Sequence, residues 1–295
     1  MWRRAAPACT PMNTDLETGT SVPRRLHTMN WPHLLLLAAL PPAAWALRDW
    51  PPEQVLALLG LASLAFLMLA ERLWPLRKDW QARGPELARD GGFLGLNALV
   101  DSLTGLLLSS LALRSGLGGH GLALDLHPGL ALPLAIALGE LGPFALHRWA
   151  HQSPWLWRFH ALHHQPTKLN AANAVLAHPL NAAWNQAARL LPWLLLGFSA
   201  EVMLWAALFL QVQGLAVHAN LRGSLGPLNW LIGSAELHRW HHSVVEAEAH
   251  NYGTAIPLWD QLFGSFVHRP GQAPARLGLF AGTAPPTWLP ACCRG

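Results

Sequence analysis

Long apolar runs dominate the first half of the chain. They cover 55–74, 93–113 and 130–146, and polar segments separate them. A helix needs about 20 apolar residues to cross a bilayer, so these runs predict membrane-spanning helices. An earlier run, 31–47, is short and interrupted by two prolines, which makes it the weakest candidate. The pattern therefore predicts an all-α integral membrane protein with about four transmembrane helices.

A fifth apolar region, 190–217, contains Gly197-Phe198-Ser199 near its middle. One long helix could cover it, but its length favours a re-entrant helical hairpin that dips into the membrane and returns. Residues 1–30 are polar and rich in Pro, Thr and Arg, without the apolar core of a signal peptide. We interpret them as a disordered tail, and the sequence leaves open whether Met29 is the true start.

The same patterns divide the chain into four parts. They are the N-terminal tail (1–30), the transmembrane helices (31–146), a histidine-rich helical cap (147–270) that contains the membrane hairpin (190–217), and a C-terminal tail (271–295).

The charge of the loops predicts the orientation of the chain. Segment 75–90 carries four Lys and Arg residues, whereas 114–129 carries one arginine and one aspartate. The positive-inside rule places 75–90 in the cytoplasm. Four crossings and a returning hairpin then bring every residue cluster after 146 to the same side. We expect a cytosolic cap, in a bacterial inner membrane given the Ala-, Leu- and Arg-rich composition.

Composition narrows the partners and metal ligands that the chain can be expected to have. Only 12% of residues are charged, against about 25% in soluble domains, and the formal net charge of +4 forms no basic stripe, which argues against nucleic-acid binding. The three cysteines, Cys9, Cys292 and Cys293, show no C-x-x-C spacing, so sulfur is not an expected metal ligand. Histidine is the anomaly, with 16 residues against a single tyrosine.

The histidines gather in three short boxes. These are His147-Arg-Trp-Ala-His151, His160-Ala-Leu-His163-His164 and His238-Arg-Trp-His241-His242. Residues three and four apart share one face of a helix, so each box directs imidazoles to a common point. Eight imidazoles are too many for one tetrahedral zinc ion, and imidazole also suits iron, copper and nickel. We expect two metal ions, with His178 and His218 as further candidate ligands.

Glu140 lies about two helical turns before His147, on the same stripe of the predicted helix. A carboxylate inside a membrane span is costly and usually functional. We expect Glu140 to accept the N–H of a ligand imidazole, which would fix the tautomer of that ring. A pair with Arg148, or a position facing an aqueous cavity, is the alternative.

These boxes, followed by Asn251-Tyr252-Gly253 and Trp259-Asp260-Gln261-Leu262-Phe263-Gly264, resemble the fatty acid hydroxylase/sterol desaturase superfamily over roughly residues 90–270. The resemblance implies a non-haem di-iron site on the cytosolic face, with O2 as oxidant. The implied ligands are His147, His151, His160, His163, His164, His238, His241 and His242, with His178 and His218 at positions where relatives often carry more. The expected supporting residues are Glu140, Asn220, Asn251 and Asp260, with Gly253 in a tight turn. The chain departs from some relatives at Arg222 and at His250, which we leave out of the ligand set.

The resemblance implies an O2-dependent oxidoreductase that hydroxylates a C–H bond of a fatty acyl or sterol-like lipid taken from the bilayer. No flavin, haem or iron–sulfur motif is evident, so a separate electron donor (a reductase, ferredoxin or cytochrome-like protein) is expected. A desaturase or other oxidase with the same irons remains open. A membrane metal-binding or transport protein would place charges inside the spans, and those before Glu140 carry almost none. A zinc hydrolase would need an H-E-x-x-H motif, which is absent.

Overall fold

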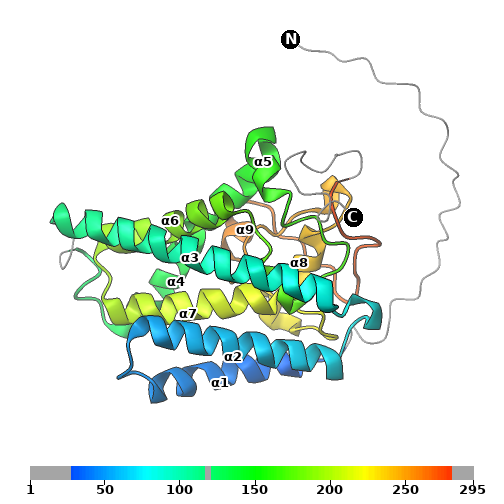
Figure 1. The fold of residues 1–295 in the computed structure, drawn as a ribbon, viewed down its shortest axis with the longest axis horizontal. Coiled ribbons are helices and arrows are strands. Elements are labelled where there is room, and N and C mark those ends of the chain that lie inside the picture. Colours follow the sequence, from blue (N-terminus) through cyan, green and yellow to red (C-terminus); the bar gives the residue numbers. More distant parts are fainter. Residues whose placement is uncertain (1–27, 117–120, 281–295) are drawn as a thin grey trace, which may run out of the picture.

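The computed structural model describes residues 28–116 and 121–280, and this part of the chain is helical without strands (Figure 1). Most of the predicted N-terminal tail, and 281–295 of the predicted C-terminal tail, lie outside the described residues. The long helices are α1 (Trp31–Ala46), α2 (Pro52–Leu73), α3 (Gly84–Arg114), α4 (Pro128–Gln152), α6 (Pro179–Leu196) and α7 (Ala200–Ala216). The short ones are α5 (Pro154–His160), α8 (Ala235–His241) and α9 (Leu258–Leu262), with the 3-10 turns η2 (Lys78–Trp80), η3 (Ala171–Val175), η4 (Gly226–Trp230) and η5 (Glu246–Glu248).

Three helices, α2, α3 and α4, are long and apolar enough to cross a membrane. They coincide with the three strongest apolar runs of the sequence. Helix α1 continues through both prolines but has only 16 residues, fewer than the roughly 20 that a crossing takes. The chain is thus a helical membrane protein with three candidate spans, and the fourth crossing stays a prediction.

The fifth apolar region is two helices, which meet at the break seen in the sequence. Gly197 ends α6 in the left-handed conformation, with φ of 69°, where a residue without Cβ is favoured. The Ser199 side chain then accepts the amide N–H of Val202 and caps α7. Helix α6 begins at residue 179, earlier than the hydropathy predicts, because its first half is polar on one face.

The long helices form a curved row around a central space. Helix α1 packs on α2, α2 on α7, α7 on α4, α4 on α6, and α6 on α3. The helices α2 and α3 barely touch one another in the described residues, so the row stays open between them. The turn η3 contacts α2, α3 and α7 and closes this opening at one end.

All the histidine boxes lie at one end of this row, where α8 and α9 also gather (Figure 1). Backbone bridges there join Pro75 to Leu221 and Met29 to Ser224. At the opposite end, the Ala123 amide donates to the Leu196 carbonyl beside the α6–α7 turn. The predicted cap and segment 75–90 therefore share one end of the molecule.

Candidate metal centre

Nine histidines converge in two groups. The five-histidine group contains His147, His151, His160, His164 and His241, and the four-histidine group contains His163, His218, His238 and His242. Within each group the candidate ligand nitrogens all lie within 4.8 Å of one another. The rings come from the end of α4, from α5 and the turn after it, from the end of α7, and from α8.

Neighbouring histidines separate between the two groups. His238 on α8 and His242 directly after it are four residues apart and join the four-histidine group, whereas His241 faces the other group. His163 and His164 separate in the same way after α5. Each H-x-x-H-H box therefore serves both groups and fixes their distance from one another.

Five of the rings are anchored through Nδ1, which determines where their lone pair lies. The partners are the carbonyl oxygens of Tyr252 for His147, Leu176 for His163, Gly214 for His218 and His250 for His241, and the side-chain oxygen of Asn181 for His160. A carbonyl oxygen only accepts, so Nδ1 carries the proton in each of these rings. In a neutral imidazole, Nε2 is then left as a bare acceptor that faces the group.

The bare nitrogens approach each other too closely to be stable without a cation between them. His163 Nε2 and His218 Nε2 are 3.1 Å apart, and neither has a proton to donate. His164 Nε2 lies 3.1 Å from His160 Nε2 and 3.0 Å from His241 Nε2, two more bare acceptors. The nitrogens of His151 and the Nε2 of His147 are buried and have no hydrogen-bond partner. This donor set fits bound metal ions, because a cation would satisfy every one of these lone pairs.

The spacing also fits. An imidazole nitrogen lies about 2.1 Å from a divalent ion, so adjacent donors are about 3.0 Å apart in an octahedral site and about 3.4 Å apart in a tetrahedral one. The nearest pairs lie 3.0 Å to 3.2 Å apart, including 3.2 Å between His238 and His218 and 3.1 Å between His242 and His238, and all donors of a group lie within 4.8 Å of one another. The nearest donors in each group are therefore close enough to share one metal ion.

Burial keeps the rings neutral. It lowers the pKa of His163 to about 4, because a buried imidazolium loses its hydration. Burial likewise lowers the pKa of His218, His241 and His242 far below the ordinary value for histidine. A neutral imidazole is the form that binds a metal, so these rings are competent ligands at physiological pH.

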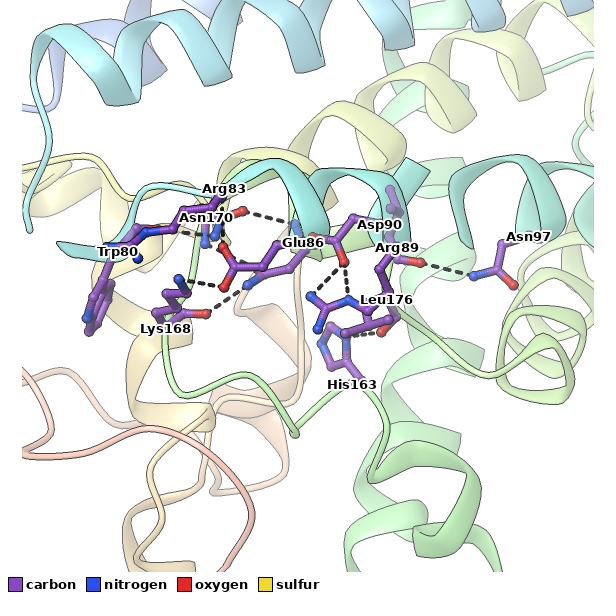
Figure 2. Close-up of polar contacts among 12 residues, drawn as sticks. Trp80, Arg83, Glu86, Arg89, Asp90, Asn97, His163, Lys168, Asn170 and Leu176 are labelled. Carbon is purple, nitrogen blue, oxygen red and sulfur yellow. Dashed lines mark hydrogen bonds and ion pairs between the residues drawn. The ribbon is translucent and has the colours of Figure 1, made fainter. Parts of the chain in front are cut away.

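The segment whose carbonyl anchors His163 is held in turn by α3 (Figure 2). Asn97 donates through its side-chain amide to the carbonyls of Val175 and Ala177, at 3.0 Å each, on either side of Leu176. Lys168 forms an ion pair with Glu86 at 2.6 Å, which holds the chain before Leu176 against the start of α3. Asn97 is a positioning residue that the sequence analysis missed. An amide side chain within an apolar run was the feature that could have indicated it.

The loop 250–255 supports the five-histidine group. Two of its carbonyls, those of His250 and Tyr252, accept the Nδ1 protons of His241 and His147. Asp260 accepts the amide N–H groups of Tyr252 and Gly253 and the hydroxyl of Ser265. Asp260 therefore orients the loop instead of touching a ligand ring.

The turn chemistry of this loop differs from the prediction. Asn251 is the left-handed residue, with φ of 60°, and Gly253 is required for close approach instead. A Cβ on Gly253 would lie 2.7 Å from the Ile256 carbonyl oxygen and 2.9 Å from an Asp260 carboxylate oxygen. Asparagine is among the few residues with a Cβ that adopt this conformation readily, and the Asn251 side chain is held by hydrogen bonds to Leu237 and Val267.

Three predicted residues have other partners than expected. Glu140 accepts the amide N–H groups of Thr254 and Ala255, because the loop and not a ligand ring packs against α4 at its level. The expected bond to an imidazole is therefore wrong, and so is the alternative pair with Arg148, which donates to the Phe263 carbonyl. Asn220 exchanges hydrogen bonds with the Arg77 backbone and touches no ligand ring. His178 caps α6 through Nδ1 and lies outside both histidine groups.

A cavity of about 480 Å³ extends from the histidines into the helix row. Its wall at the cap end includes His147, His160, His163, His218 and His238. Apolar side chains of α2, α3 and α7 line most of the remainder, but Asp101, Asn185 and Arg189 also face it. Sequence reasoning missed these three. Their signals were a carboxylate within an apolar run and polar residues spaced by four from Asn181.

The fold and the site define a class, a helical membrane protein with a histidine cluster that could hold metal, and comparison with known proteins makes this specific. Residues 132–265 match the family model for fatty acid hydroxylase. The ornithine lipid hydroxylase OlsE of Rhizobium tropici is 32% identical over 259 residues, which cover 84% of this chain and 78% of that protein. The chain belongs to the fatty acid hydroxylase/sterol desaturase superfamily.

Other relatives match over shorter stretches. The alkylglycerol monooxygenase of Xenopus tropicalis is 26% identical over 137 residues, 43% of this chain and 28% of that protein. The fatty acid hydroxylase vlmA of Lecanicillium sp is 29% identical over 152 residues, 43% of this chain and 39% of that protein. No solved structure matches significantly. Relationship to hydroxylases and monooxygenases supports an oxidoreductase.

Proposed function

We propose that this chain is a membrane-bound, non-haem di-iron oxygenase that hydroxylates a C–H bond of a lipid with O2. The observation that carries the proposal is the pair of imidazole groups, whose bare nitrogens converge at one end of a largely apolar cavity. One iron would be held by the five-histidine group and the other by the four-histidine group. When bound, two irons and O2 supply an oxidant strong enough for an unactivated C–H bond.

The donor set favours iron over zinc. A structural zinc ion takes four ligands, and a catalytic zinc ion usually takes three from the protein. Here nine imidazoles form two groups of five and four, each more than the three that a catalytic zinc ion usually takes. The described residues place no thiolate in either group. Iron with positions left open for O2 is the metal most consistent with this arrangement.

The chain's own residues contribute orientation and exclusion of water. The anchored rings hold the donors in place before metal binds, so little reorganisation is needed. The apolar wall of the cavity, with Leu61, Leu64 and Leu94, suits a hydrocarbon chain and keeps water away. We infer that the lipid enters through the opening between α2 and α3, which faces the bilayer. The relatives named for ornithine lipid and alkylglycerol agree with a lipid substrate.

Metal content tests the proposal, and two adjacent residues provide matched variants. His241 and His242 belong to different groups, so His241→Ala and His242→Ala should each reduce about two irons per chain to about one. The double variant should hold almost none. His178→Ala is the control and should keep two, because His178 lies outside both groups. Zinc alone, or no metal above background in protein made with ample iron, would overturn the di-iron proposal.

Product mass then separates the two reactions that this centre supports. A gain of one oxygen atom in a lipid incubated with the iron-loaded enzyme, O2 and a reductant indicates hydroxylation. A loss of two hydrogen atoms would instead establish the desaturase. The reductant should come from a separate donor protein, which we expect to dock on the cytosolic cap.

The proposed cytosolic position of the cap has its own test. Asp79 lies at the cap end and Asp125 at the opposite end, and both are exposed. In a chain with its native cysteines replaced, Asp125→Cys should react with an impermeant thiol reagent added outside the cells. Asp79→Cys should react only after the membrane is opened. The reverse pattern would place the cap outside.

A further inference from the structure

The cavity contains polar groups well away from the histidines. We call Asp101 of α3 and Asn185 and Arg189 of α6 the deep polar cluster. Asn181, Asn185 and Arg189 are spaced by four residues and therefore lie along one face of α6. Asn181 binds His160 at 2.8 Å, so α6 connects the metal centre directly to this cluster.

The geometry of α6 gives the distance. Eight residues separate Asn181 from Arg189, which corresponds to about 12 Å along the helix axis at 1.5 Å per residue. Side chains on a helix lean toward its N-terminus, so Arg189 reaches back along the cavity toward the histidines. A ligand that contacts Arg189 therefore has its other end near the metal centre.

The cluster is short of partners in the described residues. Arg189 Nε and Asn185 Oδ1 are buried and make no hydrogen bond. Arg189 interacts electrostatically with Asp101 and Glu140, but no direct ion pair joins it to either. Glu140 is already occupied by the Thr254 and Ala255 amides. Unpaired charges at membrane depth are costly, and they are usually retained for a ligand or a transported group.

We propose that the deep polar cluster recognises the polar part of the substrate, and that the substrate is an N-acylated amino acid lipid. Arg189 would bind its carboxylate or amide carbonyl as a forked donor. Asp101 and the Asn185 carbonyl oxygen would accept from its N–H groups. This inference rests on the proposed function, because it assumes that the bound lipid is the one oxidised. The oxidised carbon should lie within about 12 Å of the polar group.

Selectivity follows from the unpaired groups. A plain fatty acid or an alkylglycerol of the same chain length would leave Asp101 or Arg189 without a partner in the cavity. Sites built to bond a polar group can reject an analogue that lacks it by a factor of about 10⁴. The cavity should therefore prefer the amino acid lipid over an alkylglycerol or a plain fatty acid of the same chain length.

Arg189→Met and Asp101→Asn test the proposal in the full-length, iron-loaded enzyme. Both should lower kcat/KM for an N-acylated amino acid lipid by about 10- to 100-fold, because each removes a charged hydrogen bond. Both should leave iron at two per chain, because neither residue belongs to a histidine group. Arg158→Met, an exposed arginine outside the cavity, is the control. Asn185→Leu serves as a second variant if Arg189→Met fails to fold.

A binding measurement separates this proposal from the proposed function. Thermal stabilisation by the amino acid lipid, without O2 or reductant, should be lost in Arg189→Met and kept in Arg158→Met. A methyl ester of the same lipid should bind more weakly if the carboxylate is the contact. Stabilisation that depends on Arg189 in a chain that hydroxylates nothing would preserve the subsite and refute the oxygenase. Equal binding and turnover of both lipid types in wild type and Arg189→Met would refute the subsite alone.

Discussion

Replacing Asn251 tests how the loop 250–255 holds the five-histidine group. The Asn251 side chain donates to the carbonyls of Leu237 at 3.1 Å and Val267 at 2.9 Å, and accepts the Val267 amide N–H at 2.8 Å. It is 2% exposed, so water cannot easily replace these bonds. Its backbone is left-handed, with φ of 60°.

The expected cost follows from these contacts. Asn251→Ala removes three hydrogen bonds to buried backbone groups, at about 1 kcal/mol each. The left-handed backbone adds about 1 kcal/mol for a residue with a Cβ and no bonding side chain. We expect a total loss near 4 kcal/mol. Asn251→Gly loses the same bonds but not the backbone preference, so it should be about 1 kcal/mol more stable than the alanine variant.

Thermal denaturation of the detergent-purified protein, together with iron analysis, measures both effects. The stability order should be wild type, Asn251→Gly, Asn251→Ala. Both variants should resemble His241→Ala in iron content, because the loop anchors His241 and His147 and not the four-histidine group. Two irons retained in Asn251→Ala would refute the role of the loop. A glycine variant no more stable than the alanine variant would refute the backbone argument.

Three further substitutions probe the supports of the site. Asn97→Leu removes two hydrogen bonds to the carbonyls on either side of Leu176 and should lower the free energy of unfolding by about 2–4 kcal/mol. Its iron content should fall toward that of a variant in the four-histidine group, and unchanged iron would contradict the positioning role of Asn97. Gly142→Ala places a Cβ 2.5 Å from the Ala188 carbonyl oxygen, so α4 and α6 must move apart, and the protein should lose about 1–3 kcal/mol of stability. An unchanged melting temperature would contradict this close approach. Burial raises the pKa of Asp260 to about 6, so its contribution to stability is full below about pH 4 and is lost as the pH rises through 6. The melting temperature of wild type minus that of Asp260→Asn should therefore decrease from pH 4 to pH 6.5, and a flat or rising difference would contradict the shift.

The helical chain and the convergence of the boxes could be predicted because both are local properties. Apolar run length predicts α2, α3 and α4, and spacing by three and four predicts that the histidines of each box lie together. Local spacing does not show that His241 and His242 face different groups, since that depends on where α5 and α7 lie. For the same reason the partner of Glu140 was predicted wrongly. The loop that it binds follows it by more than one hundred residues.

The polar face of α6 shows a second limit. Averaged hydropathy detects the apolar half of the helix and misses residues 179–189, where Asn181, Asn185 and Arg189 lie. Their spacing by four was present in the sequence, but only the packing of α6 on both α3 and α4 shows that this face borders a cavity.

The anchoring of the rings has a consequence for how the enzyme tolerates change. Four of the five anchored imidazoles donate to main-chain carbonyls, those of Leu176, Gly214, His250 and Tyr252, and only His160 depends on a side chain, that of Asn181. The amino acids at those four positions can be substituted without rotating the ligand rings, because any amino acid supplies the same backbone carbonyl. The coordination sphere is thus insulated from most substitutions around it. Among these five partners Asn181 is the exception, because its own side chain accepts the Nδ1 proton of His160.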